Sequence, residues 1–291
     1  MCDYAALIID IENSKKYIVE ERNEIQNYIF FCIEQLNKLF GSNMRFDVTF
    51  SAGDELQGLF KDVTTAVLYF RLFEMLIKPV NIRAGIGIGE WTIKVKEGLS
   101  TQQDGPVYHR ARKAVEEVHK MQLQNIRICS ENDDIMANHL LNASILLKRQ
   151  QIYMQNMVFS IIEFLYPFVT DEMKLIDYET IVKTILKKKF EYRIRAKQNY
   201  SFSNKKEDLR SLNIEDFEIP VADPIIIDGN CVEAENVIGK KNVAATISKI
   251  LGSTRQNVEL IIKRGNANKI RELDFMALQY VRKQYGGEVW N

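Results

Sequence analysis

The order of hydrophobic periodicities in the first 130 residues constrains the fold more than any other feature of the sequence. Residues 4–9 are an unbroken apolar run that ends at Asp10, which is typical of a buried strand. The pattern then predicts, in order, a helix at 14–41, strands at 45–50 and 55–60, a helix at 63–77, a strand at 80–88, a helix at 106–121 and a strand at 125–129. The order β-α-β-β-α-β is that of the split βαβ, ferredoxin-like fold, so we expect an α/β (α+β) domain over residues 1–130.

Two glycines in the strand at 80–88 carry a further structural prediction. Gly85 and Gly87 alternate with apolar residues, and glycine inside a strand often marks the close approach of another element. We therefore expect a neighbouring segment to pack directly on this strand.

Beyond residue 130 the sequence becomes mainly helical. We expect a helical region at 131–198 without strands, a polar connector at 199–230 and a helical domain at 231–291. A basic cluster lies near the end of the helical region, and it consists of Lys187, Lys188, Lys189, Arg193, Arg195 and Lys197. Its simplest interpretation is a solvated helix face, and the alternative is a contact with phosphates or a protein partner.

Charge and cysteine content restrict the compartment and the partners of the chain. The 39 lysines and arginines balance 39 aspartates and glutamates, which argues against the bulk coating of nucleic acid. The 4 cysteines include no CxxC pair, so we expect reduced thiols in the cytoplasm and no zinc site. The acidic beginning of the chain does not resemble a signal peptide, and the longest apolar stretch is too short to span a membrane.

Two carboxylates occupy positions that suggest a metal site. Asp10 ends the first strand and Asp54 lies in the hairpin turn, so adjacent strands would bring both side chains to one edge of the sheet. Carboxylates held close together repel each other unless a cation lies between them, and Mg²⁺ or Mn²⁺ suits such a pair. Alternatively, Asp54 is an ordinary turn residue.

The segment after Asp10 leads into a helix N-terminus. Free backbone N–H groups there, together with Lys15 or Lys16, would suit the phosphates of a nucleoside triphosphate. In the alternative interpretation, Asn13 or Ser14 is an ordinary helix cap.

Several motifs resemble those of known families. IIDI at 8–11, AGDEL at 52–56, RAGIGIG at 83–89 and GPVYHRAR at 105–112 resemble the motifs of class III nucleotidyl cyclases and GGDEF diguanylate cyclases. GDELQGL at 53–59 and DGPVYHRARKA at 104–114 together resemble the SatD family of bacterial proteins more closely, over nearly the whole chain. The resemblance implies a cyclase-type palm domain followed by a helical DNA-binding segment.

The resemblance also assigns roles to residues. It implies that Asp10 and Asp54 hold Mg²⁺ with help from the Ile11 carbonyl, and that Arg112 steadies phosphate charge. Further residues that it places at the nucleotide are Gly53, Glu55 and Tyr108. Tyr108 stands where cyclases have an asparagine that acts during cyclisation, and this departure counts against cyclic nucleotide synthesis more than against nucleotide binding.

Residues 242–265 predict a helix-turn-helix. Apolar positions at helical spacing flank a turn at Gly252, and the pattern resembles DNA-binding proteins of the type LGxSRQxVxxxL. The residues expected at DNA are Thr254, Arg255, Gln256, Asn257, Lys263 and Arg264. Such segments usually work as homodimers on paired half-sites, and the alternative use is a protein contact.

Three hypotheses therefore remain open from the sequence. The first is a regulator that binds a nucleoside triphosphate with Mg²⁺ and also binds DNA. The second is an active cyclase or polymerase-like transferase that makes a signalling nucleotide. The third is an inactive palm that serves as a dimerisation scaffold, against which the presence of Asp10 and Asp54 argues.

Overall fold

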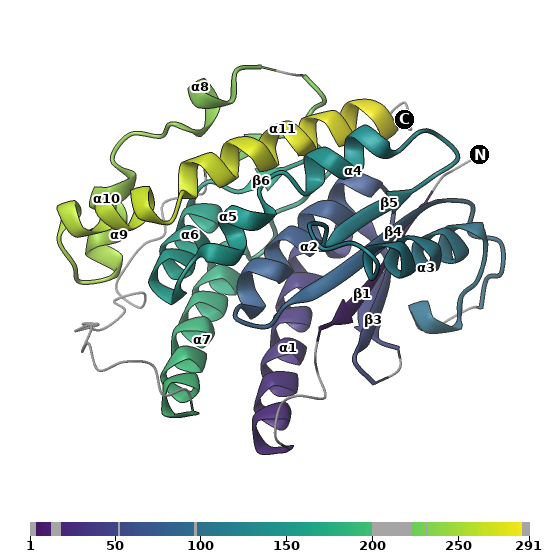
Figure 1. Cartoon of the computed structure of the whole chain (residues 1–291), viewed down its shortest axis with the longest axis horizontal. Helices are drawn as coiled ribbons and strands as arrows, with labels where there is room; N and C mark the ends of the chain where they lie inside the picture. The colour runs from purple at the N-terminus through teal and green to yellow at the C-terminus, as the bar shows by residue number, and fades with distance from the viewer. Residues whose placement is uncertain are drawn as a thin grey trace.

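A five-stranded sheet with helices on both faces is the central feature of the computed structural model (Figure 1). The structure describes residues 4–12, 19–51, 53–95, 98–199, 223–230 and 232–286. The strands are β1 (Tyr4–Ile11), β2 (Met44–Phe50), β3 (Glu55–Phe60), β4 (Ile82–Gly89) and β5 (Ile126–Cys129), in the spatial order β2-β3-β1-β4-β5. β1 is antiparallel to both β3 and β4, whereas β4 and β5 are parallel.

Three helices cover the sheet: α1 (Val19–Phe40), α2 (Val63–Ile77) and α3 (Pro106–Val118). Alternation along β1 shows how they divide, because residues one apart in a strand point to opposite faces. Leu7 and Ile9 are buried in the large core with α1 and α2, whereas Ala6 and Ile8 are buried in a smaller core with α3. The predicted ferredoxin-like order is confirmed, and α3 with β5 extends it by one parallel strand.

Gly85 and Gly87 allow α3 to lie directly on β4, as the sequence predicts. A Cβ atom on Gly85 would be 2.3 Å from the Ala111 carbonyl oxygen, and one on Gly87 would be 2.0 Å from the Val107 carbonyl oxygen. No side chain tolerates such distances, so the two glycines set the depth at which α3 packs.

Asparagine side chains satisfy backbone groups of β5 along its outer edge. Asn138 lies in α4 (Ile135–Leu141), accepts from the Ile128 amide at 2.7 Å and donates to its carbonyl at 3.0 Å. Asn142, one helical turn later, donates to the Ile126 carbonyl at 2.8 Å. An exposed strand edge is a template for pairing with other chains, and these side chains cover this one.

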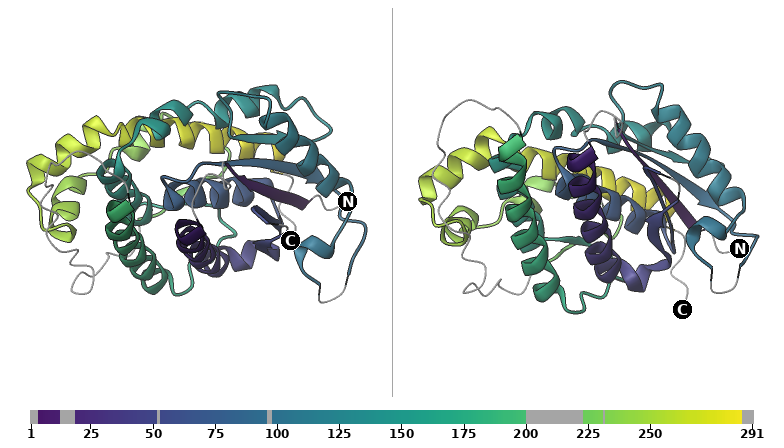
Figure 2. Two further views of the ribbon diagram at one scale, coloured as in Figure 1. Left: turned by 60° about the horizontal axis from the view of Figure 1, so that its bottom comes forward. Right: turned by 90° about the horizontal axis from the view of Figure 1, so that it is seen from below.

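The elements from α5 onward form a mainly helical layer beside the sheet domain (Figures 1 and 2). They are α5 (Ile145–Gln150), α6 (Tyr153–Leu165), β6 (Phe168–Val169), α7 (Tyr178–Asn199), β7 (Ile225–Ile226), α8 (Ala234–Ile238), α9 (Val243–Ile250), α10 (Arg255–Arg264) and α11 (Ala267–Tyr285). The 3₁₀ turns η2 (Gly41–Asn43) and η3 (Ser100–Gln102) belong to the sheet domain, where both contact β2. The large core runs without interruption from β1 to Val281 in α11, so the predicted sheet and helical regions share one interior.

Two differences from the sequence expectation concern short elements. β6 and β7 pair in parallel, although the sequence predicts no strand after the sheet domain. Each has two residues, which is too short for a periodicity to be visible. β7 lies in the predicted connector, of which residues 200–222 are outside the described part. In the described residues, no helix is both long and apolar enough to cross a membrane.

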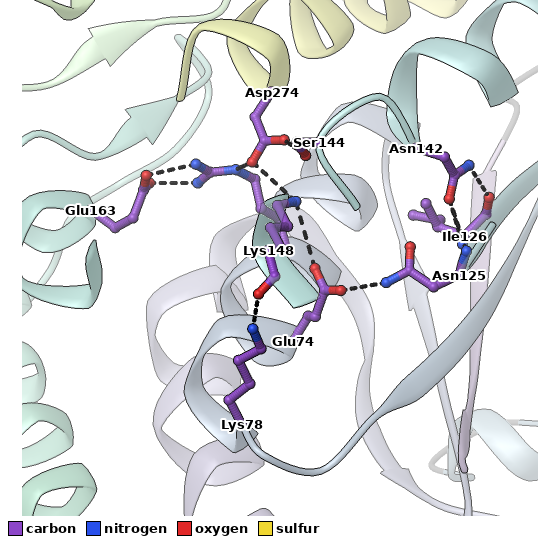
Figure 3. Close-up of polar contacts among 10 residues, drawn as sticks. Glu74, Lys78, Asn125, Ile126, Asn142, Ser144, Lys148, Glu163 and Asp274 are labelled. Atoms are coloured by element: carbon purple, nitrogen blue, oxygen red, sulfur yellow. Dashed lines mark hydrogen bonds and ion pairs between the residues drawn. The ribbon is translucent and has the colours of Figure 1, made fainter. Parts of the chain in front are cut away.

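A buried group of charges joins α2, α6 and α11 (Figure 3). We call Arg71, Lys148, Glu163, Arg271 and Asp274 the ionic cluster. Arg71 from α2 donates to Glu163 of α6 at 2.6 Å and, through Nε, to Asp274 of α11 at 2.6 Å. Nη1 of Arg271 in α11 lies 2.7 Å from Glu163 Oε1, the oxygen that also accepts from Arg71, and Lys148 of α5 lies 3.1 Å from Asp274. The opposite charges of the ionic cluster therefore neutralise one another inside the protein and hold the last helix to the sheet domain.

Lys189 contradicts the interpretation of the basic cluster as a solvated face. Its side chain is buried to 1% exposure, and Nζ donates to the Met75 and Leu76 carbonyls at 3.0 and 2.9 Å. Burial lowers the pKa of Lys189 to about 7. The interpretation is wrong for this residue because Lys189 continues the buried stripe of α7, whereas the side chains of residues 193–197 are outside the described part.

Candidate functional site

Charged residues from three adjacent strands lie together at one end of the sheet, where β1 ends and β3 and β4 begin. We call this end of the sheet the carboxylate edge. Asp10 at the end of β1 is paired in register with Glu55 at the start of β3 and with Arg83 near the start of β4. Residues two apart in a strand share a face, and Ile8 belongs to the core beneath α3. Asp10 therefore lies on the α3 face of the sheet, as the centre of a row of three charges.

Asp54 joins this row from the hairpin turn. Its carbonyl accepts a hydrogen bond from the Ile11 amide at 3.3 Å, which fixes the turn against the end of β1. Gly53 has φ of +65°, a conformation that glycine adopts without strain, and a Cβ there would meet nothing within 4 Å. The glycine is thus required for the shape of the turn rather than for close packing.

The electrostatics of Asp10 show that the two predicted carboxylates influence each other. Partial burial raises the pKa of Asp10 above its usual value, and the charges of Asp54 and Glu55 raise it further, while His119 and Arg83 act in the opposite direction. Burial is therefore the main cause of the raised pKa of Asp10, and the neighbouring charges act in both directions. The backbone hydrogen bond from Ile11 to Asp54 places the hairpin turn beside the end of β1, and a cation shared by the two carboxylates stays a prediction.

Cationic side chains enter from α3 and from β4. Arg112 forms a two-pronged pair with Glu55, in which Nη2 is 2.7 Å from Oε1. His119, which follows α3, has Nε2 at 3.3 Å from Asp10 Oδ2. Arg83 Nε lies 2.9 Å from Glu12 Oε1, so acidic and basic groups alternate along the edge.

Sequence reasoning missed three members of this arrangement. They are His119, Arg83 and Glu12. A signal existed for His119, since it lies seven residues after Arg112 and two helical turns bring it to the same side of α3. Arg83 opens the quoted RAGIGIG motif, but its partner depends on strand register, which the motif does not contain.

Tyr108 occupies a different environment from the other predicted site residues. Its ring is 6% exposed and lies in the small core, in the same cluster as Trp91. Its hydroxyl is 3.3 Å from the Ser100 hydroxyl, and burial raises the pKa of Tyr108 to about 12. The predicted phosphate contacts at residues 13–16 lie outside the described residues.

The donor set at the edge fits a hard divalent cation. Among the described residues, no three His, Cys, Asp or Glu side chains are grouped so that they could hold a metal ion. Mg²⁺ commonly takes one or two carboxylates and completes its shell with phosphate and water oxygens. Asp10, Asp54 and the Ile11 carbonyl are the groups that would hold it.

At the other end of the molecule, α9 and α10 are joined by a four-residue turn. Gly252 in this turn has φ of +58°, and Val258 of α10 is buried. Thr254 caps α10 by accepting from the Asn257 amide at 3.2 Å. The predicted DNA-contacting residues are all exposed, namely Thr254, Arg255, Gln256, Asn257, Lys263 and Arg264.

The fold defines a ferredoxin-like α/β protein with a row of charged residues across the end of its first strand. A family model for the SatD family matches residues 4–195, and the chain belongs to that family. No curated protein matches the chain.

Two solved structures with similarity to the chain are of bacterial light-regulated adenylyl cyclase. Both are 12% identical to it, with TM-scores of 0.31 and 0.32. The matches cover 44% and 43% of this chain, and 75% and 42% of the cyclase chains.

Proposed function

We propose that the chain binds a nucleoside triphosphate together with Mg²⁺ or Mn²⁺ at the edge formed by Asp10 and Asp54. We further propose that this site regulates a DNA-binding segment formed by α9 and α10. The observation that carries the first part is the position of Asp10 at the end of β1, in register with Glu55 and beside the turn that the Ile11–Asp54 backbone hydrogen bond fixes. A divalent cation between the carboxylates would stabilise their ionised forms.

The arginine on α3 supports a triphosphate as the second ligand. Glu55 binds Arg112 at the carboxylate edge, and the Arg112 side chain is 45% exposed. Guanidinium groups bind carboxylates and phosphates with the same two-pronged geometry. An incoming phosphate could therefore replace Glu55 as the partner of Arg112 without a change of backbone.

Binding is favoured over cyclisation because of Tyr108. Cyclases place an asparagine at this position, whereas the hydroxyl of Tyr108 is directed to Ser100 within the small core. The alternative functions are an active nucleotidyl cyclase or polymerase-like transferase and an inactive dimerisation scaffold. Mass spectrometry after incubation with each nucleoside triphosphate and Mg²⁺ or Mn²⁺ distinguishes them, since only the enzyme forms a product.

Substitution of Asp54 tests the metal-dependent site. We expect Asp54→Asn to abolish the Mg²⁺-dependent binding of ATP and GTP in isothermal titration calorimetry, because one carboxylate of the pair is lost. Asp171→Asn, which changes an exposed aspartate outside the site, is the matched control and should bind like the wild type. Wild-type affinity in Asp54→Asn would refute the proposed site.

The exposed first turn of α10 supports the DNA-binding part. Arginine, glutamine and asparagine side chains can read base edges in the major groove, and residues 255–257 present this set to solvent. We expect Arg255→Ala combined with Gln256→Ala to weaken DNA binding in a fluorescence anisotropy titration at low salt, whereas Lys174→Ala should not. The absence of DNA binding by the wild type would leave a protein contact as the use of this segment.

Sedimentation analysis tests the expected homodimer.

A further inference from the structure

A groove with a volume of about 540 Å³ lies beside α10, far along the chain from the carboxylate edge. Its walls come from α6, the segment between α8 and α9, α10, and the first turn of α11. Pockets that hold small ligands have volumes of about 300–1,000 Å³ and combine an apolar floor with a few polar groups. The groove meets both conditions.

The floor of the groove is apolar and includes one aromatic ring. Ile162, Ile238 and Ala244 line it and are buried, and Ile262 is half-buried beside them. Tyr166 adds a half-buried ring, with Lys240 Nζ 5.8 Å from its centre. A flat apolar group could bury its faces against these side chains.

The rim of the groove carries an excess of positive charge. Four cationic residues line it, Lys240, Arg255, Lys263 and Lys269, against two acidic ones, Glu259 and Glu272; Lys240 is in addition paired with Asp223 at 2.5 Å, which leaves an excess of one. Arg255 is paired with Glu259 at 2.8 Å, and Lys269 is paired with Glu272 at 3.2 Å. Within the described residues Lys263 takes part in no ion pair, so its charge is available to a ligand.

The groove runs along one side of α10 from its first residue to its last turn. The end of α10 is fixed, since Gln151 donates to the Gly265 carbonyl at 2.8 Å and Gly265 lies against Gln155. Arg255, at the start of α10, lines the groove together with Lys263. A ligand in the groove would therefore connect this side of α10 to Tyr166 and Lys240.

We propose that this groove binds a small organic anion with a flat apolar ring, whose charged group contacts Lys263 and whose ring lies on Ile262 and Tyr166. The proposal goes beyond the nucleotide site and does not depend on it. Arg255 and Lys263 are also expected at DNA, so occupancy of the groove and DNA binding draw on the same two side chains.

The test uses 8-anilinonaphthalene-1-sulfonate, a fluorescent aromatic anion, with the full chain and without nucleotide or divalent cation. We expect saturable binding at one site per chain, weakened roughly tenfold by Lys263→Gln because a charge-assisted hydrogen bond is lost. Arg264→Gln is the matched control, since it removes the neighbouring exposed charge, which does not line the groove. Circular dichroism and the melting temperature establish that all variants remain folded.

A second probe separates the contribution of charge from that of shape. The neutral 1-naphthalenemethanol should bind at least tenfold more weakly than 1-naphthoate in calorimetry, and Lys263→Gln should remove most of this difference. Non-saturable binding of the sulfonate would overturn the proposal, and so would equal effects of Lys263→Gln and Arg264→Gln. Loss of nucleotide binding in Asp54→Asn should leave both probe affinities unchanged, which keeps the two proposals distinguishable.

Discussion

Removal of the Asp274 carboxylate should lower the free energy of unfolding, because Asp274 connects the last helix to the sheet domain through Arg71. Asp274 accepts from Arg71 Nε at 2.6 Å and from the Ser144 hydroxyl, and it lies 3.1 Å from Lys148 Nζ. Asp274→Ala leaves these donors buried without their acceptor, and Glu163 alone then faces both Arg71 and Arg271.

The expected loss follows from the burial of the charges. Breaking a buried ion pair by removing one partner costs about 3–5 kcal/mol, because the remaining charge is uncompensated. Arg71 is 5% exposed and Asp274 is 6% exposed, so water offers little compensation. Since whole domains are stable by about 5–15 kcal/mol, this one carboxylate accounts for a large fraction of the free energy of unfolding.

The pH dependence of this loss has a defined sign. Burial alone would raise the pKa of Asp274, but Lys148 and Arg71 outweigh it and hold the pKa below its usual value. A depressed folded pKa gives stability that is present above the unfolded pKa of about 3.9 and is lost as the pH falls through the folded value. The difference between wild type and Asp274→Ala should therefore shrink below about pH 4.

Urea denaturation followed by circular dichroism at pH 7 and at pH 3.5 measures these quantities. Glu272→Ala is the matched control, because Glu272 lies on the same helix and is paired with the exposed Lys269. Surface pairs of this kind contribute about 0–1 kcal/mol. A loss in Asp274→Ala that is no larger than in this control would refute the reasoning from buried charge.

Two further predictions concern packing and a buried lysine. Gly87→Ala should lower the free energy of unfolding by about 1–3 kcal/mol in urea denaturation, because the added Cβ would collide with the backbone of α3. Gly41→Ala is the control and should have little effect, because a Cβ there meets nothing within 4 Å. Equal effects of the two substitutions would contradict the assigned contact. Burial lowers the pKa of Lys189 to about 7, so the folded state disfavours the ammonium form and stability should rise with pH above 7 by up to about 1.4 kcal/mol per unit. Lys189→Met should flatten this rise between pH 7 and 9.5, and an unchanged slope would argue against a titrating lysine in the interior.

The sequence predicts the sheet domain well because its signals are local. The helix at Val63–Ile77 has the predicted bounds, since Asp62 accepts from the Thr65 amide at its start and Pro79 follows its end. The contact made by Gly87 is also local, because a strand glycine can be recognised without knowing which helix covers it. The short β6 and β7 escape prediction, since each depends on a partner more than 50 residues away.

The candidate site likewise contains residues that a local motif predicts and residues whose position depends on distant parts of the chain. Asp10, Asp54 and Arg112 are predicted from motifs and stay predictions as ligands, whereas the position of Arg83 opposite Asp10 depends on strand pairing and cannot be derived from a motif. The helical spacing of Lys189 indicates burial, but the basic residues around it favour the interpretation as a solvated face. It falls at the buried helical spacing, seven residues after Val182 and three after Leu186, both of which are in the core.

The ionic cluster decides which part of the chain could move in regulation. The family model ends at residue 195, yet Arg71 within it requires Asp274 from α11 for neutralisation. Rotation of α11 as a body against the sheet domain would separate buried charges, at a cost of about 3–5 kcal/mol for each broken pair. The exposed side of α10 instead borders an open groove, where the surface pair Arg255–Glu259 can rearrange while Val258 of α10 and Ile247 of α9 stay in the large core. Rearrangement of exposed side chains on α10, with its buried contacts and the ionic cluster intact, is therefore the cheaper route by which a ligand could alter the proposed DNA binding.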